Sequence, residues 1–145
     1  MKSVLFLCTG NYYRSRFAEE LFNHQARHVG LDWMATSAAL AIERGAGINI
    51  GPLSSHTLKA LTDRGVRASR AAHFPRQCVF SDLEAADLIV ALDETEHRPL
   101  MLERFRAWSD RVTFWHVEDV HAWSPDRAVA SIEREVVALV SRIRS

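Results

Sequence analysis

Four short apolar runs that alternate with amphipathic stretches constrain the fold of this chain more than any other feature. The runs lie at about residues 4–7, 33–36, 88–92 and 112–117, and they are typical of buried β-strands. The stretches after them carry helical periodicity. A β-α-β-α-β-α-β-α order predicts an α/β fold, in which a four-stranded parallel sheet carries helices on both faces in three α/β/α layers.

Capping residues mark where several helices begin. Ser54 or Ser55 precedes the second long helix, and Gly65 stops it. Ser124 is followed by a proline at the first helical position, which is typical of a helix start. Pro99 is compatible with a helix only in its first turn. The predicted helices cover about residues 14–28, 55–64, 82–86 and 96–108, and a last helix begins at 125.

The composition limits the classes of function. Residues 1–145 are the size of one domain, and 48% of them are apolar, enough for a substantial core. The 18 basic and 18 acidic residues balance, so neither nucleic acid nor an anionic membrane is expected as a partner. No apolar stretch approaches the ~20 residues of a membrane span, and the N-terminus lacks a signal-peptide pattern. We therefore expect one domain over residues 1–145 in the cytoplasm.

The cysteines and histidines indicate neither a disulfide framework nor a metal site. Cys8 and Cys78 are the only cysteines, and the histidines show no metal-ligand spacing. No metal or other cofactor is therefore expected. Cys78 is interpreted as a buried or inert thiol, with a reversible bond to Cys8 left open.

The segment from Cys8 to Ser15 carries the strongest functional signal. It connects the first predicted strand to the first predicted helix. Ligands of parallel sheets bind beyond the carboxyl ends of the strands, where the strand order reverses. The first strand is the natural centre of that reversal, so Cys8 is expected at a site that the fold itself offers.

The backbone of this segment is suited to binding a phosphate dianion. Turn residues between a strand and a helix can aim successive N–H groups at one point, and the helix N-terminus adds partial positive charge. Gly10 relieves the steric cost of the tight turn, and Asn11 tolerates the left-handed conformation and can brace the loop. The predicted phosphate-binding turn consists of Thr9, Gly10, Asn11, Tyr12 and Tyr13.

Three side chains supply the chemistry. Arg14 can donate two parallel hydrogen bonds to phosphate oxygens. The same positive surroundings favour the thiolate form of Cys8, which is placed for in-line attack on phosphorus. Ser15 can donate its hydroxyl to the sulfur. Taken alone, Cys8 is equally consistent with a small buried residue at a strand end, and the combination favours the nucleophile.

These residues resemble the signature of the low-molecular-weight protein tyrosine phosphatases. That signature is a strand of the form V-L-F-V followed by Cys-x-Gly-Asn-x-x-Arg-Ser near the N-terminus, and residues 4–15 fall into register with it. The segment 36–39 resembles the family's Ser-Ala segment, which implies that Ser37 braces Asn11. The segment 73–77 resembles a His-x-Ala-Arg-Gln motif, which implies that His73 is a buried supporting residue. The resemblance covers essentially the whole chain and implies the same four-stranded fold.

The chain also departs from the family pattern. Tyr13 stands where a second, protective cysteine is common, so that redox protection is expected to be absent. Arg16 stands where proline is usual. The general-acid loop of the family usually contains Asp-Pro, whereas residues 118–123 contain no proline. The resemblance assigns the general acid to Asp119.

Two groups around the expected site leave alternatives open. A carboxylic acid that protonates the leaving phenolate contributes ~10²–10⁴-fold. Asp119 is favoured because the loop after the fourth strand reaches the same sheet edge as Cys8, with Glu118 and Asp126 as alternatives. The aromatic residues Tyr12, Tyr13 and Trp123 either wall a slot for an aromatic ring or cover the loop.

The leading hypothesis is a phosphatase that hydrolyses phosphotyrosine in proteins through a cysteinyl-phosphate, as a monomer or weak dimer. A phosphate-binding or interaction module without catalysis is the main alternative. Arsenate reduction would need further cysteines, and Cys78 is the sole candidate. Phosphoarginine hydrolysis is less favoured, because relatives with that specificity carry threonine where Tyr12 stands.

Overall fold

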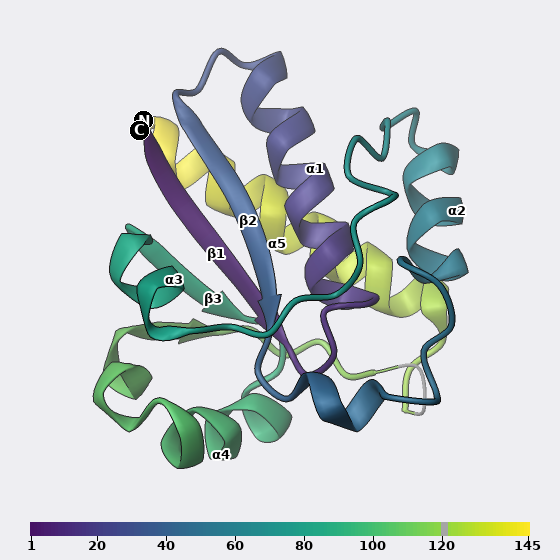
Figure 1. The fold of residues 1–145 in the computed structure, drawn as a ribbon. Coiled ribbons are helices and arrows are strands. Elements are labelled where there is room, and N and C mark those ends of the chain that lie inside the picture. Colours follow the sequence, from purple (N-terminus) through teal and green to yellow (C-terminus); the bar gives the residue numbers. More distant parts are fainter. Residues whose placement is uncertain (120–121) are drawn as a thin grey trace.

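The computed structural model describes residues 1–119 and 122–145 of the chain (Figure 1). Strands and α-helices alternate along most of it, with two short 3-10 helices at Ile42–Gly45 and Arg106–Arg111. The strands are β1 (Lys2–Cys8), β2 (Trp33–Ala39), β3 (Leu88–Ala91) and β4 (Val112–Phe114). The α-helices are α1 (Arg14–His28), α2 (Ser55–Asp63), α3 (Phe80–Ala85), α4 (Glu94–Arg104) and α5 (Pro125–Arg144).

The four strands form one parallel sheet in the order β2-β1-β3-β4. This confirms the predicted α/β fold with a four-stranded parallel sheet. The chain moves outward from β1 to β2, then returns to the other side of β1 to place β3 and β4. The strand order therefore reverses at β1, and Cys8, the last residue of β1, lies at the reversal point.

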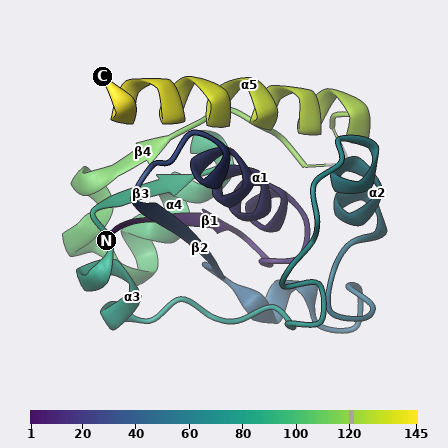
Figure 2. The same ribbon diagram turned by 90° about the horizontal axis from the view of Figure 1, so that it is seen from above.

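Each face of the sheet has its own core because side chains of a strand alternate between its faces. Val4, Phe6 and Cys8 of β1 belong to a cluster with residues of α1 and α5, whereas Leu5 and Leu7 belong to a cluster with residues of α3 and α4. Figure 2 shows α1 and α5 on the same side of the sheet, where the two helices pack against each other. The predicted three-layer arrangement is thus present.

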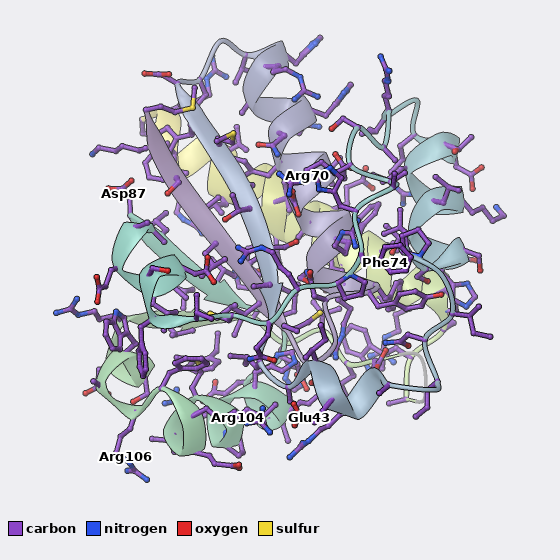
Figure 3. All side chains as sticks on the ribbon, viewed as in Figure 1. Glu43, Arg70, Phe74, Asp87, Arg104 and Arg106 are labelled. Atoms are coloured by element: carbon purple, nitrogen blue, oxygen red, sulfur yellow. The ribbon has the colours of Figure 1, made fainter. Side chains whose placement is uncertain are left out.

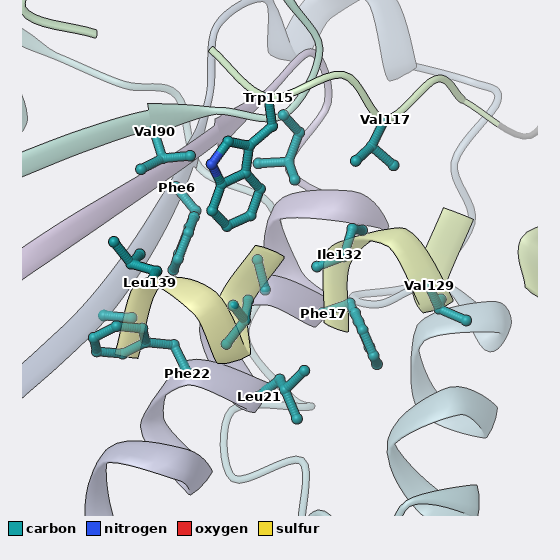
Figure 4. Close-up of a cluster of buried hydrophobic side chains, with 14 of the residues drawn as sticks. Phe6, Phe17, Leu21, Phe22, Val90, Trp115, Val117, Val129, Ile132 and Leu139 are labelled. Carbon is teal, nitrogen blue, oxygen red and sulfur yellow. The ribbon is translucent and has the colours of Figure 1, made fainter. Parts of the chain in front are cut away.

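The larger core fixes the start of α1 and hence the residues after Cys8. The ring of Phe6 contacts those of Phe22 and Trp115, with centroids 6.0 and 5.6 Å apart (Figure 4). Phe17 and Ile132, from α1 and α5, are fully buried in the same cluster. At roughly 25 cal/mol per Å² of buried apolar surface, such side chains contribute about 1.5–3 kcal/mol each.

Several element boundaries differ from the sequence-based ones. β2 continues three residues beyond Thr36, because Ser37 to Ala39 pair in register with Phe6 to Cys8. The helix predicted over 96–108 ends at Arg104, and Trp108 lies in a 3-10 helix. α4 begins at Glu94 rather than at residue 96, so Pro99 is its sixth residue and lies beyond the first turn, where the sequence had placed it. The fourth strand is shorter than predicted, although Trp115 and Val117 still donate backbone hydrogen bonds to the end of β3.

The predicted caps of two helices are confirmed. The Ser54 hydroxyl accepts a hydrogen bond from the backbone N–H of His56 at the start of α2. The Ser124 hydroxyl accepts one from the N–H of Arg127, with Pro125 as the first residue of α5. Within the part of the chain that the structure describes, no helix combines the length and apolar character needed to cross a bilayer.

Candidate active site

Residues 8–15, here called the cysteine loop, leave β1 and turn into α1 with their carbonyl groups directed outward. The carbonyls of Cys8 and Thr9 accept hydrogen bonds from the N–H groups of Leu40 and Ala41, at 2.9 and 3.0 Å. Those of Tyr12 and Tyr13 accept from Ser54 N and from the Thr57 hydroxyl. In a trans peptide the N–H points opposite to the C=O, so the following N–H groups face the inside of the loop. The loop is therefore shaped as an anion-binding nest.

Asn11 holds the bend of the cysteine loop. Its backbone φ of 52° is left-handed, a conformation that asparagine tolerates better than most residues. Its side-chain amide donates to the hydroxyls of Ser15 and Ser37, each at 2.9 Å, and its Oδ1 accepts from the backbone N–H of Arg76 at 3.1 Å. The predicted contact between Ser37 and Asn11 is thus present.

Gly10 does not have a positive φ, and the left-handed residue of this turn is Asn11. A Cβ at position 10 would lie 3.1 Å from the side-chain nitrogen of Asn49. Glycine is therefore used here for close approach to the neighbouring 46–51 segment rather than for its backbone freedom.

The sulfur of Cys8 lies at the floor of the loop and is 3.0 Å from the hydroxyl oxygen of Ser15. Cys8 is only 3% exposed. Because the Asn11 amide already donates to the Ser15 oxygen, the Ser15 proton is available to a sulfur anion. The hydroxyl is thus placed to stabilise negative charge on the sulfur.

Arg14, in the first turn of α1, is buried with its guanidinium held on two sides. One terminal nitrogen donates to the carbonyl of Val117 at 2.9 Å, and the other lies 2.8 Å from Glu96 Oε2 and 3.8 Å from Asp119 Oδ2. Burial alone would lower the pKa of Arg14, but the nearby charges of Cys8, Glu96 and Asp119 raise it. Arg14 therefore remains a fixed cation beside the sulfur.

Glu96 and His97, at the start of α4, are site residues that the sequence did not reveal. Thr9 donates its hydroxyl to Glu96 Oε2, and His97 Nε2 lies 3.2 Å from the same oxygen. His97 Nδ1 accepts from the backbone N–H of Asp93 at 3.0 Å, so the ring carries its proton on Nε2. Burial lowers the pKa of His97, which keeps the ring neutral. Both residues lie more than eighty positions from the cysteine loop, and no local pattern marks them.

The expected burial of His73 is wrong. His73 is exposed, and its Nδ1 lies 3.2 Å from Arg70 Nη2. Arg70 lies on the segment that passes α1 (Figure 3), where it pairs at 3.3 Å with the buried carboxylate of Glu19. Glu19 in turn accepts a hydrogen bond from Ser37. Asn11 Oδ1 accepts its hydrogen bond from the backbone of Arg76, without His73.

One cavity of about 280 Å³ opens above Cys8. It brings together most of the predicted site residues, with Arg44 and His56 added at its rim. Trp123 is absent from its lining and packs instead against His116 and Arg127. The lining residues are Cys8, Thr9, Gly10, Tyr12, Tyr13, Arg14, Arg44, Gly45, Ile48, Asn49, Ser54, His56 and Asp119.

The two tyrosines of the loop form part of the cavity wall. The Tyr12 hydroxyl donates to the carbonyl of Ile50 at 2.5 Å, which connects the loop to the 46–51 segment. Tyr13 is buried, and burial together with the charge of Asp119 raises its pKa to about 12. Its hydroxyl therefore stays protonated at neutral pH and does not serve as a general base.

Asp119 is the predicted acid that lines the cavity, whereas neither Glu118 nor Asp126 does. Its side chain is 41% exposed, so it can meet a ligand that enters from solvent. Val120 and His121, which belong to the predicted acid loop, lie outside the described residues. Within residues 1–119 and 122–145, no three His, Cys, Asp or Glu side chains are grouped so as to hold a metal ion.

Comparison with known proteins links this geometry to one family. The model of the "low molecular weight phosphotyrosine protein phosphatase" family matches residues 3–144. The protein-arginine-phosphatase of Bacillus subtilis is 28% identical over 109 residues, which cover 75% of this chain and 67% of that protein. The low molecular weight protein-tyrosine phosphatase A of Mycobacterium tuberculosis is 35% identical over 101 residues, which cover 67% of this chain and 56% of the relative.

Solved structures extend the likeness to the fold. A low molecular weight protein tyrosine phosphatase from T. tengcongensis superposes with a TM-score of 0.80 at 24% identity, covering 98% of this chain and 99% of the other. At this identity the likeness concerns the path of the backbone.

Proposed function

Because the chain belongs to the low molecular weight phosphotyrosine protein phosphatase family, we propose that it hydrolyses phosphotyrosine in proteins through a cysteinyl-phosphate intermediate. The observation that carries the proposal is the single cavity that joins the Cys8 sulfur, the Arg14 guanidinium and the Asp119 carboxylate. A nucleophile, an anion-binding cation and a proton donor are the three groups that this reaction needs.

In the first proposed step, the thiolate of Cys8 attacks phosphorus and the bond from phosphorus to the phenolic oxygen breaks. The bonding electrons leave with the phenolic oxygen, which takes the proton of Asp119. The inward N–H groups of the cysteine loop and Arg14 stabilise the charge on the other phosphate oxygens. A cysteinyl-phosphate and a neutral tyrosine result.

In the second step, the Asp119 carboxylate takes a proton from a water molecule while the water oxygen attacks phosphorus. The sulfur–phosphorus bond breaks, and the electrons return to Cys8 as a thiolate. Ser15, 3.0 Å from the sulfur, stabilises it as a leaving group by donating its hydroxyl. Inorganic phosphate then leaves, and Asp119 is protonated again for the next cycle.

The lining of the cavity favours an aryl phosphate as the substrate. Tyr12 and Tyr13 offer ring surface beside Cys8, and aromatic pairs contribute about 0.5–1.5 kcal/mol beyond their buried area. The Bacillus relative that acts as a protein-arginine-phosphatase keeps phosphoarginine as a second candidate. We place the reaction in the cytoplasm, with a phosphorylated protein as the partner.

Thiol-dependent arsenate reduction is less favoured by the position of the second cysteine. Cys78 is buried in the core cluster on the opposite side of the sheet from that of Cys8. Burial raises the pKa of Cys78 to about 12, so its thiol is a poor nucleophile at neutral pH. It is therefore badly suited to relay a disulfide outward.

The test compares wild type with Cys8→Ser on a phosphotyrosine peptide and on the same peptide with phosphoarginine. We expect vanadate-sensitive phosphate release from the phosphotyrosine peptide, reduced by at least about 10⁴-fold in the variant. Faster release from the phosphoarginine peptide would change the substrate class but keep the mechanism. Tight vanadate binding without turnover of either peptide would identify a binding module and refute the proposed function.

A further inference from the structure

Asp119 is flanked by two aromatic side chains that pack against each other. His116 lies three residues before it and Trp123 four residues after it, and their ring centroids are 6.3 Å apart in an edge-to-face arrangement at 80°. The guanidinium of Arg127, in the first turn of α5, lies over the ring of Trp123, 3.9 Å from the ring centroid. His116, Trp123 and Arg127 are here called the clasp.

The clasp is attached to the sheet through His116. His116 Nδ1 lies 3.3 Å from Oδ1 of Asp93, at the junction of β3 and α4, and the two residues also form an isolated backbone bridge. The side chain of Asp93 does not cap α4. Its Oδ1 is buried and has no hydrogen-bond donor among the described residues, and the His116 ring is the ion-pair partner described for it.

Backbone hydrogen bonds transmit the position of the clasp to Asp119. The carbonyl of Asp119 accepts from the N–H groups of Ala122 and Trp123, both at 3.0 Å. On the other side, Val117 donates its N–H to the carbonyl of Leu92 at 2.8 Å. Val117 before Asp119, and Ala122 and Trp123 beyond it, are therefore tied by backbone hydrogen bonds, while the Asp119 carboxylate remains partly exposed beside the cavity above Cys8.

We propose that the clasp of His116, Trp123 and Arg127 positions Asp119 for proton transfer in the catalytic cycle. This inference rests on the proposed function, because it assumes that Asp119 is the acid. The clasp residues touch neither the cavity nor the sulfur, and they act by holding both ends of the segment that carries the carboxylate. A displacement of about 1 Å in a reacting group can cost on the order of 10²-fold in rate, so such anchoring has a measurable effect.

A purely structural role predicts a different result. Trp123 also packs against the larger core cluster, so its loss could destabilise the protein without any special effect on proton transfer. Proton donation matters most for a poor leaving group. Phenol, like tyrosine, has a pKa of about 10 and needs the proton, whereas 4-nitrophenol leaves readily without it. Sensitivity to the leaving group therefore separates the two roles.

The experiment measures kcat/KM of Trp123→Ala with phenyl phosphate and with 4-nitrophenyl phosphate. We expect a loss of about tenfold with phenyl phosphate and of less than about threefold with 4-nitrophenyl phosphate. Trp123→Phe keeps an aromatic edge for His116 and should restore most of the activity. Trp33→Ala is the matched control, since Trp33 is also half-buried against the larger cluster but begins β2 at the far end of the strand.

A double variant shows whether the clasp acts through the acid. In an Asp119→Asn background, Trp123→Ala should cause no further loss with phenyl phosphate. Equal losses on both substrates, or a full additional loss in that background, would overturn the inference. Should Trp123→Ala fail to fold, His116→Gln gives the same readout, because His116 is 66% exposed and glutamine loses the aromatic ring but can still donate to the buried Asp93 Oδ1.

The inference and the proposed function fail in different ways. If wild type shows no turnover that depends on Cys8, the proposed function is wrong. If wild type and Asp119→Asn behave as expected but both clasp variants match wild type on the two substrates, only the inference is wrong.

Discussion

The cysteine loop and the segment that carries Asp119 differ in how tightly the fold holds them. Cys8, Asn11, Arg14 and Ser15 are all buried, and their side chains contact one another or the neighbouring strands. Asp119 is 41% exposed, with its carboxylate 3.8 Å from Arg14, and further contacts hold the described residues on either side of it. The fold thus surrounds the Cys8 sulfur with hydrogen-bonded side chains, whereas it holds Asp119 mainly through the backbone of Val117, Ala122 and Trp123.

This difference matches what each region has to do. The charge on a transferring phosphoryl group is stabilised best by donors that need no reorganisation during the reaction. A proton donor must instead meet the leaving oxygen of a substrate that enters from solvent. We therefore expect substitutions in the cysteine loop to impair both binding and chemistry, and those near Asp119 to impair chemistry alone.

The largest expected effect follows from replacing the cation of the cysteine loop. Arg14→Lys removes the planar fork that contacts Val117, Glu96 and the proposed phosphate together. We expect kcat/KM to fall by about 10³-fold, with a parallel loss of vanadate affinity in a competition assay. Arg98→Lys, a change of the same kind on the exposed face of α4, is the control and should stay near wild type. Equal losses in the two variants would mean that Arg14 has no special role.

The second-largest expected effect follows from replacing Asp119, the proposed acid, and should leave anion binding intact. Asp119→Asn removes the proton donor, so kcat/KM with phenyl phosphate should fall by about 10²-fold. Vanadate affinity should hold or increase, since a negative charge 3.8 Å from Arg14 is lost. Glu118→Gln is the adjacent control. A larger loss in Glu118→Gln would show that the acid was assigned to the wrong residue, and a loss of vanadate binding in Asp119→Asn would contradict the contrast between the regions.

The cysteine loop could be predicted from the sequence because its parts are adjacent in the chain. Cys8 at the end of a strand, a left-handed Asn11, Arg14 in the first helical turn and Ser15 lie within eight residues, and periodicity gives the strand and the helix on either side. The parallel sheet was predicted from the alternation of apolar runs with amphipathic stretches along the chain. Asp119 needed the family resemblance as well as its place after the fourth strand.

What could not be predicted depends on contacts between distant segments. Nothing in the local sequence around Glu96 indicates that it meets Arg14, because the register of β3 against β1 brings α4 to the cysteine loop. The motif resemblance also misplaced His73 as a buried support. Arg70 pairs with the carboxylate of Glu19, and the backbone N–H of Arg76 donates to Asn11. Among the described residues, His73 hydrogen-bonds to neither that carboxylate nor that amide, and it lies at the surface beside Arg70.

The smallest effect, and the one that sharpens the comparison most, concerns Glu96, the second carboxylate beside Arg14. Burial opposes its ionisation, but hydrogen bonds from His97 and Arg14 hold its pKa well below the ordinary value of 4.5. Glu96→Gln keeps a hydrogen-bond acceptor and loses the charge. We expect kcat/KM to fall about tenfold, because Arg14 is held less firmly on the side of α4.

The pH dependence of the unfolding free energy distinguishes a Glu96 that holds Arg14 from a Glu96 that acts as a general acid. A carboxylate whose folded pKa is depressed stabilises the fold above its unfolded pKa of about 4.5, and this contribution is lost as the pH falls through the lower folded value. The difference in unfolding free energy between wild type and Glu96→Gln, about 1–3 kcal/mol at neutral pH, should therefore shrink below pH 4.5 in urea titrations.

Glu19→Gln is the control, with the opposite pH dependence expected. Burial raises the pKa of Glu19, so its contribution is present below the unfolded value and is lost as the pH rises through the folded one. Parallel pH profiles for the two variants would contradict this assignment of charges around the cysteine loop.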